Sequence, residues 1–431
     1  MRYFYFMSRL YMQQNMENHV DQGHLLINIR SETGEIPIEG ATIRLSYSGQ
    51  PDTVLETLSS NVSGQTEELL LDTPPLEYSM EPSPNQPYAE YTIDVTAEGY
   101  EPINISGIEL LPNEQAVQNV NLTPLAEAVT NEDHIVIGPH TLYGDYPPKI
   151  PEDEIKPVNE SGEIVLSRVV VPEYVVVHDG PPNDNSANDY YVRFRDYIKN
   201  VACSEIYATW SDSTIRANVL AIISFTLNRV YTEWYRNKGY DFTITSSTAY
   251  DHKWIRGRNV FENISYIVDE IFANYLSRPN VKQPILTQYC DGQRVQCLDR
   301  GWMTQWGSKY LGDQGYTPID IIQYYYGDDM YINTAEQISG IPASWPGYDL
   351  SIGSGGAKVR QMQEQLDRIA QTYTAIPRVR ADGIYGPATA EAVREFQRIF
   401  GLPVTGVVDY PTWYEISDIY VAITRIGELY P

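Results

Sequence analysis

The spacing of apolar residues changes along this chain, and that change constrains its fold more than any other feature of the sequence. Between residues 21 and 124, short runs of alternating apolar and polar residues are separated by glycine or proline. A period of two is typical of half-buried strands, and closely spaced short strands indicate a small β-sandwich. Over residues 214–236 the apolar positions instead step by three or four. This spacing predicts a long amphipathic helix that begins at Ser211 or Asp212 and ends at Gly239.

With 431 residues the chain is long enough for several domains, and these changes of pattern divide it. Acidic residues and prolines around 146–154 predict an extended linker, the kind of segment in which proteases cut. Regular glycines after residue 350 indicate a compact unit of three helices. We therefore expect a multidomain protein with five segments: an N-terminal tail (1–20), a β-sandwich (21–124), an acidic linker with a candidate cleavage site (125–172), a central α+β domain (173–345) and a three-helix domain (350–431).

Acidic charge is concentrated on the N-terminal side of the sequence. The whole chain carries a net charge of −27, of which residues 1–172 hold −20, residues 173–350 hold −6 and residues 351–431 hold −1. Affinity for nucleic acids and anionic membranes comes mainly from lysine and arginine, so neither is an expected partner. The acidic front third is either a removable segment that masks the rest of the chain or a solvated acidic surface.

No apolar run approaches the roughly 18–20 residues of a membrane span. The apolar patch over residues 3–7 is also shorter than the apolar core of a secretory signal, which has about 7–15 residues. We therefore expect no membrane segment and no recognisable signal peptide. An extracytoplasmic substrate would then be reached by lysis or by deposition on a spore from the mother cell.

Three cysteines are too few for a disulfide framework, and only Cys290 and Cys297 lie close together in the sequence. A local disulfide, two free thiols or a shared metal ion would each fit their spacing. Zinc usually takes four ligands, and no histidine lies within reach in the sequence. The pair is therefore a weak candidate for zinc, and we expect no cofactor.

Glu205 stands inside the most informative stretch of the sequence. It belongs to a block at residues 197–210, and three further blocks follow at residues 215–221, 303–307 and 313–327. In order and content these blocks resemble the stage II sporulation protein D family of lytic transglycosylases, over about 130 residues. This resemblance implies that Glu205 is the catalytic acid of an enzyme that cleaves peptidoglycan.

A lone glutamic acid is enough for the reaction that this resemblance implies. The acid protonates the glycosidic oxygen of the β-1,4 bond between N-acetylmuramic acid and N-acetylglucosamine. Its carboxylate then accepts the proton of the C6 hydroxyl, which attacks C1 and leaves a 1,6-anhydro end. A hydrolytic muramidase would instead use a second carboxylate, for which the sequence offers Asp212, Asp251 and Asp299. A non-catalytic wall-binding or coat-assembly protein is the remaining alternative.

Four residues of the central domain are candidates for binding the glycan: Arg216, Tyr250, Gln305 and Trp306. An aromatic ring can stack on a sugar and an amide can bond to an N-acetyl group, although packing in the core would equally explain the two aromatic residues. Where the family has a further arginine, this chain has Ile223, so Arg229 is a candidate for supplying the missing charge. His252 is interpreted as a polar surface residue.

Residues 353–414 resemble the three-helix type of peptidoglycan-binding domain. Gly383 and Gly386 permit a tight turn there, while the spacing of apolar residues predicts a core stripe made of Leu366, Val393 and Phe396. The resemblance implies a ligand groove near four residues: Asp382, Tyr385, Thr389 and Gln397. The β-rich segment resembles the transthyretin-type, carboxypeptidase regulatory-like modules, which are usually structural.

The order of these modules resembles the clostridial spore cortex-lytic enzyme precursors. This resemblance implies a proenzyme that a subtilisin-like protease activates before it degrades cortex peptidoglycan during germination. It also implies a location in the spore cortex or coat, or in the extracytoplasmic cell wall. Peptidoglycan is therefore the expected partner. The expected inhibitory pro-region is the acidic N-terminal part, ending somewhere within residues 125–170.

Overall fold

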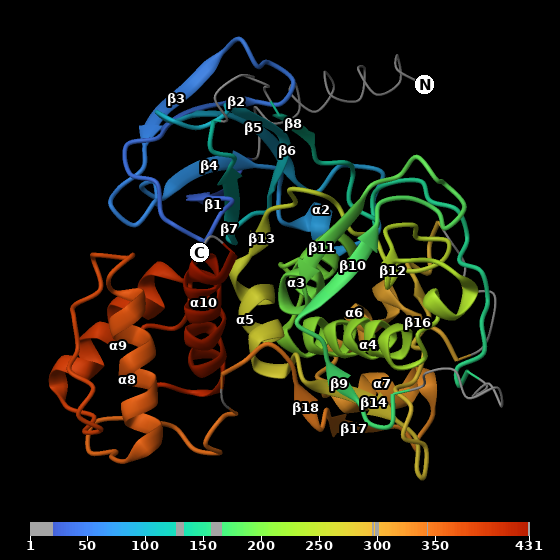
Figure 1. Cartoon of the computed structure of the whole chain (residues 1–431). Coiled ribbons are helices and arrows are strands. Elements are labelled where there is room, and N and C mark those ends of the chain that lie inside the picture. Colours follow the sequence, from blue (N-terminus) through green and yellow to red (C-terminus); the bar gives the residue numbers. More distant parts are fainter. Residues whose placement is uncertain are drawn as a thin grey trace. The chain divides into compact units, whose positions relative to one another are not determined.

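The computed structural model describes residues 20–125, 133–156, 166–294, 297, 301–342 and 344–429. The chain forms two compact units (Figure 1). The first unit comprises Met1–Pro75, Tyr88–Ile137 and Gly340–Pro431, and the second comprises Leu76–Pro87 and Gly138–Ser339. Apart from Val20, the predicted N-terminal tail lies outside the described residues. The five predicted segments stay a prediction, since the β-rich and the C-terminal helical segments fall into one unit.

The β-rich part of the first unit contains two mixed sheets. One has the strand order β3-β2-β5-β6-β8, with only β6 and β8 parallel, and the other includes β7, β1 and β4, with β1 parallel to β7. Alternate residues of β5 (Tyr91, Ile93 and Val95) are fully buried, as a period of two predicts. The strands are β1 (Asp21–Ser31), β2 (Thr42–Tyr47), β3 (Val54–Ser59), β4 (Leu69–Thr73), β5 (Ala89–Thr96), β6 (Ile103–Leu110), β7 (Gln115–Leu122) and β8 (Asp133–Val136).

The C-terminal part of the first unit is helical, as predicted, with α8 (Ala357–Ile369), α9 (Pro387–Ile399) and α10 (Tyr410–Leu429). The predicted stripe of Leu366, Val393 and Phe396 is fully buried. Pro387 begins α9, a position where its missing N–H removes no helical hydrogen bond.

The second unit combines helices with small sheets, which agrees with the α+β class expected for the central segment. Its helices are α2 (Glu77–Met80), α3 (Phe194–Glu205), α4 (Asp212–Tyr231), η1 (Arg236–Lys238), α5 (Glu262–Ile271), α6 (Gln305–Asp313) and α7 (Pro318–Tyr326). Its strands are β9 (Val170–Val171), β10 (Tyr174–His178), β11 (Asp189–Arg193), β12 (Ile244–Thr245), β13 (Val260–Phe261), β14 (Asn274–Ser277), β15 (Tyr289–Cys290), β16 (Met303–Thr304), β17 (Tyr331–Thr334) and β18 (Gln337–Ile338).

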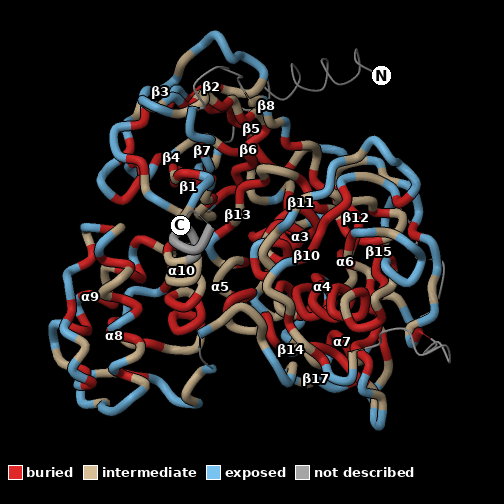
Figure 2. The backbone as a smooth tube through the Cα atoms, viewed as in Figure 1, coloured by how far each residue is buried: buried red, intermediate tan, exposed pale blue. Residues whose placement is uncertain are grey.

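Helix α4 is the central element of the second unit and is buried along nearly its whole length (Figure 2). The start was predicted correctly, because the Ser211 side chain accepts the N–H of Thr214 as an N-cap. The prediction that this helix is amphipathic was wrong. The helix is surrounded by α3, α5, α6, α7 and β14, which bury even Thr226 and Asn228.

The end of α4 also differs from the prediction. The helix stops at Tyr231, and a short 3-10 turn, η1, follows after a break. Gly239 ends that turn with a φ of 85°, a conformation that glycine adopts without strain. Gly239 therefore does end a helical element, but that element is η1 and not α4.

Part of the predicted acidic linker is packed into the second unit. Lys149 is 8% exposed and Lys156 is 4% exposed, and both belong to the stretch that begins at Gly138. This stretch has the composition of a linker, but charged side chains in it bind to buried partners in the folded unit. The parts of the predicted linker at 126–132 and 157–165 lie outside the described residues.

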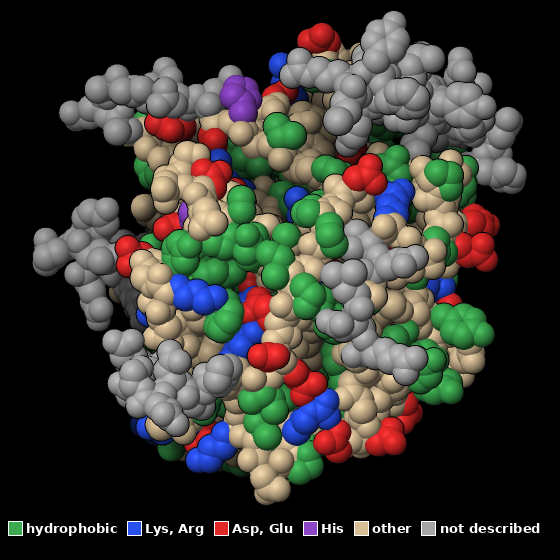
Figure 3. Space-filling model, turned by 90° about the vertical axis from the view of Figure 1, so that its right-hand side faces the viewer, with side chains coloured by type: hydrophobic (Ala, Val, Ile, Leu, Met, Phe, Trp, Pro, Cys, Tyr) green, Lys and Arg blue, Asp and Glu red, His purple; other side chains and the backbone are tan. Residues whose placement is uncertain are grey.

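On the face shown in Figure 3, the described Lys and Arg side chains are scattered among acidic and hydrophobic ones. None of the helices in the described ranges is both long enough and apolar enough to serve as a membrane span.

Candidate active site and wall-binding region

Glu205 is the last residue of α3, and only 1% of its surface is exposed. Its carboxylate accepts two hydrogen bonds, from the backbone N–H of Lys253 at 2.7 Å and from the side-chain amide of Gln305 at 3.0 Å. The Gln305 amide also donates to the Glu205 carbonyl at 3.0 Å. Because Gln305 begins α6, the end of one helix and the start of another hold the carboxylate in a single orientation.

A cavity of about 30 Å³ lies beside Glu205. The body of the second unit contributes six of its lining residues: Glu205, Thr248, Tyr289, Cys290, Asp291 and Gln305. Four more come from the stretch that was predicted as linker: Thr141, Tyr146, Pro147 and Lys149. A buried carboxyl group that reaches a cavity is the arrangement expected of a general acid.

The pKa values of two cavity-lining residues, Lys149 and Tyr289, are shifted in favour of their neutral forms. Burial lowers the pKa of Lys149, although the negative charges of Glu205 and Asp251 oppose the change. Burial and the charge of Glu205 raise the pKa of Tyr289 well above its usual value.

His252 is fully buried, so its interpretation as a surface residue is wrong. Its ring stacks on Tyr289, and its Nδ1 lies 3.0 Å from the hydroxyl of Tyr197. Burial, together with the positive charges of Lys149 and Arg229, lowers the pKa of His252 well below its usual value. The imidazole is therefore neutral at physiological pH, and it belongs to the wall behind the candidate acid.

Of the four candidate glycan contacts, only Gln305 lines the cavity beside Glu205. Arg216 is ion-paired with Asp212 at 2.7 Å and also with Glu270. The ring of Trp306 packs 5.1 Å from that of Trp210, which agrees with the packing alternative. The backbone carbonyl of Tyr250 accepts a hydrogen bond from Arg229 at 3.1 Å. A role in glycan binding for these three residues stays a prediction.

Arg229 holds a buried ion network together. Its guanidinium pairs with Asp251 at 2.7 Å and with Glu152 at 2.6 Å. The hydroxyl of Tyr235 also donates to Asp251, at 2.6 Å. Arg229, the candidate to replace the family's missing arginine, is therefore ion-paired within this network. The same holds for Asp251, one of the three candidate second carboxylates.

Of the other two candidate second carboxylates, only Asp212 is described, and it does not line the cavity. Asp212 lies exposed in the first turn of α4, and Asp299 is outside the described residues. Asp291, which the sequence did not single out, does line the cavity and is 5% exposed. Its carboxylate accepts the N–H groups of Gln293 and Arg294 at 3.0 and 3.1 Å. Only its position next to Cys290 could have drawn attention to it.

Cys290 and Cys297 form a disulfide, one of the alternatives that their spacing left open. A disulfide sulfur is not a thiolate, so this pair offers a metal no ligand in this state. Across the described ranges, no group of three or more His, Cys, Asp and Glu side chains is placed to hold a metal ion. Cys203 is a buried thiol that accepts the N–H of Phe261 at 3.3 Å.

Of the four predicted wall-binding residues, only Asp382 is exposed. Gln397 is fully buried and accepts the N–H of Gly406 at 2.8 Å, while the Tyr385 hydroxyl donates to the Gly406 carbonyl at 2.9 Å. Thr389 accepts a bond from the amide of Gln363 at 3.1 Å. These three buried side chains hold the turns of the helical region together. Contact with a ligand stays a prediction for all four residues.

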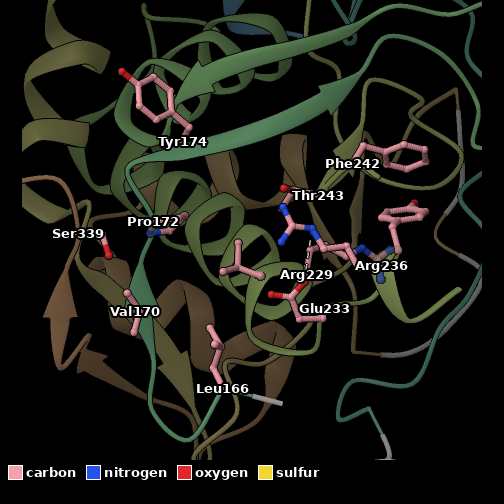
Figure 4. A pocket seen from close by; sticks show the side chains of 12 residues that line it. Leu166, Val170, Pro172, Tyr174, Arg229, Glu233, Arg236, Phe242, Thr243 and Ser339 are labelled. Carbon is pink, nitrogen blue, oxygen red and sulfur yellow. Dashed lines mark ion pairs between the residues drawn. The ribbon is translucent and has the colours of Figure 1, made fainter. Parts of the chain in front are cut away.

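A second cavity of about 180 Å³ in the second unit is lined partly by Glu233, Arg236, Tyr174 and Thr243 (Figure 4). Glu233 adopts a φ of 47°, which is uncommon for a residue with a side chain, and burial raises its pKa. Arg236 lies 3.6 Å from this carboxylate. No sequence pattern pointed to this cavity.

Comparison with known proteins identifies the C-terminal region. Residues 355–416 match the family described as "Putative peptidoglycan binding domain". The chain is therefore a multidomain protein with mixed sheets and a C-terminal helical region that carries a peptidoglycan-binding domain. Peptidoglycan is the partner that this match supports, and with it an association with the cell wall. None of the curated proteins compared with the chain matches it.

Three solved structures show weaker similarity. The N-terminal domain of SleB is 27% identical, and the match covers 18% of this chain and 99% of that one, with a TM-score of 0.16. GBS52, the minor pilin of Streptococcus agalactiae, is 11% identical over 26% of this chain and 48% of that one, with a TM-score of 0.19. Catechol 1,2-dioxygenase of Acinetobacter radioresistens is 15% identical over 28% and 59%, with a TM-score of 0.18. TM-scores this low establish neither a shared fold nor a function.

Proposed function

We propose that this protein is a lytic transglycosylase that cleaves the glycan strands of peptidoglycan. The observation that supports it best is the setting of Glu205, a buried carboxyl group held by Gln305 and the Lys253 N–H and facing a cavity. The peptidoglycan-binding domain in the same chain would keep the enzyme on its substrate.

In the proposed reaction, Glu205 acts first as acid and then as base. Its proton moves to the glycosidic oxygen as the bond from that oxygen to C1 of N-acetylmuramic acid breaks. The C6 hydroxyl oxygen of the same sugar then bonds to C1, and its proton returns to the Glu205 carboxylate. The products are a 1,6-anhydro end and a free 4-hydroxyl group, and no water is consumed.

Gln305 and the Lys253 N–H have a positioning role in this proposal. Both donate to the carboxylate, so they restrain it while it exchanges a proton. A carboxyl group restrained in this way needs little reorganisation when the substrate reacts.

A hydrolytic muramidase is the second candidate, and Asp291 is the observation that favours it. Hydrolysis uses a second carboxylate, either to activate water or to attack the sugar. Asp291 lines the same cavity as Glu205 and so could supply it. The chemistry of the product ends separates the two candidates.

The biological setting belongs to the same proposal. We place the enzyme in the spore cortex or coat, or in the extracytoplasmic cell wall, and infer that it is made as a proenzyme for germination. A subtilisin-like protease would activate it by cutting in the acidic region before residue 172.

Digestion of purified cortex and vegetative peptidoglycan, followed by mass spectrometry of the fragments, tests the proposal. Anhydro ends are expected from a transglycosylase, and reducing ends would identify a hydrolase. A chain that sediments with the wall but releases nothing, before or after proteolysis, would be a binding protein. Glu205→Gln should abolish release, whereas the same exchange at the exposed Glu336 should leave it unchanged.

A further inference from the structure

Residues 139–156, here called the strap, run across the second unit as irregular backbone bonded on both sides of the candidate acid. The N–H of Thr141 donates to the carbonyl of Ser204 at 3.0 Å, one residue before Glu205. Further along, the N–H of Ile150 donates to the carbonyl of Ala249 at 2.7 Å. The residues between these two bonds therefore pass over the cavity beside Glu205.

The cavity beside Glu205 is small, and the strap supplies part of its lining. The four strap residues in the cavity lining are Thr141, Tyr146, Pro147 and Lys149. The cavity volume of about 30 Å³ is far below the roughly 300–1,000 Å³ of sites for small organic ligands. A cavity of this volume is too small to hold a sugar ring beside Glu205 while the strap lies in this position.

The side chain of Lys149, a strap residue that lines the cavity, is buried in the unit. Its ammonium group donates to the carbonyl of Asp251 at 2.5 Å and lies 4.6 Å from the centre of the Tyr289 ring. Tyr146 is held by its own segment, because its hydroxyl donates to the carbonyl of Pro139 at 2.5 Å. Both side chains thus cover the cavity in a defined conformation.

Ion pairs to the body of the unit anchor the C-terminal part of the strap. Glu152 is paired with the buried Arg229 and with Lys156, both at 2.6 Å. Glu154 is paired with Arg278 at 2.5 and 2.8 Å. Since breaking a buried ion pair is costly, this anchor should persist when the part over the cavity moves.

We propose that residues 139–149 are an autoinhibitory segment that closes the glycan cleft over Glu205, and that residues 150–156 keep it attached. Substrate reaches Glu205 only after residues 139–149 leave the cavity. A cut on the N-terminal side of Pro139 would turn them into a free end that can leave while the anchor stays in place. The inference rests on the proposed function of Glu205. It assigns inhibition to the strap instead of to the acidic N-terminal region as a whole.

Two readouts on the full-length chain test this inference. The first is labelling of the Glu205 carboxyl group by a water-soluble carbodiimide and an amine, quantified by peptide mass spectrometry. The second is release of fragments from purified peptidoglycan. The opening variant is Tyr146→Ala/Lys149→Ala. The matched control is Asp145→Ala/Pro148→Ala, which changes two exposed strap residues that do not line the cavity.

The opening variant should label Glu205 faster than the wild type by about tenfold or more, the effect of losing one hydrogen bond from a charged group. Fragment release should rise with it, while the control should match the wild type in both readouts. Equal labelling in all three proteins would overturn the inference. So would faster labelling with less fragment release than the wild type, since the strap would then be a working part of the cleft.

Failure of the proposed function would look different. Faster labelling without fragments from any variant, with or without proteolysis, would leave the strap as a cover over Glu205 and refute glycan cleavage.

If the double substitution prevents folding, Thr141→Pro replaces it. Proline removes the backbone N–H that donates to the carbonyl of Ser204. It leaves the charged side chains in the cavity lining unchanged. The same rise in labelling is then required.

Discussion

Replacing Arg229 with methionine should destabilise the second unit strongly. The Arg229 side chain is fully buried and pairs with Asp251 and Glu152. Methionine keeps much of the apolar contact but leaves Asp251 without its cation and Glu152 with Lys156 alone, and breaking a buried pair costs about 3–5 kcal/mol. Because the second unit has about 200 residues, its midpoint of thermal unfolding should fall by roughly 6–20 °C.

Tryptophan fluorescence during heating measures this change, since five of the seven tryptophans belong to the second unit. Arg216→Met is the matched control. Arg216 also pairs with two carboxylates, Asp212 and Glu270, but these are partly exposed, and such pairs contribute about 0–1 kcal/mol. The reasoning is refuted if the two variants unfold within about 2 °C of each other. Adding Asp251→Asn to Arg229→Met should restore part of the loss, because it removes one unpaired charge.

Three further outcomes are expected. Gln305→Leu should slow glycan release by on the order of 10–100-fold without weakening sedimentation on peptidoglycan, because a hydrogen bond to a charged group contributes about 1.5–3 kcal/mol. Burial would raise the pKa of Glu152, but bonds from Arg229 and Lys156 outweigh it and lower that pKa. Glu152 therefore stabilises the fold above its unfolded pKa of about 4.3, and this contribution is lost as the pH falls through the lower folded value. The difference in unfolding midpoint between the wild type and Glu152→Gln should disappear over that range. Gln397→Leu should unfold the helical region and abolish sedimentation, whereas Leu at the exposed Gln371 should do neither.

Features that depend on neighbours along the chain could be predicted from the sequence. The alternation in β5 identified its buried face, and the three-or-four spacing identified the core stripe of Leu366, Val393 and Phe396. The N-cap at Ser211 was also predicted, because capping involves residues only three positions apart. Where the outcome depended on what packs around an element, the prediction failed, as for the buried polar residues of α4.

The candidate site shows the same division. Its motif blocks identified Glu205 and Gln305 as residues of one site, but not that the Gln305 amide would bond to the acid itself, 100 residues away in the sequence. Asp291 carries no local pattern, so only the fold shows that it shares the cavity.

The strap shows most clearly what the sequence alone determined and what required the tertiary structure. Prolines and acidic residues predicted an extended linker of the kind that proteases cut, and residues 146–154 are indeed irregular, but charged side chains among them are paired inside the folded unit. In the folded unit, Glu152 and Glu154 meet Arg229 and Arg278, and Lys149 meets a backbone carbonyl. Composition sets how much a segment loses on leaving water, whereas only the tertiary structure brings the partners that compensate for that loss.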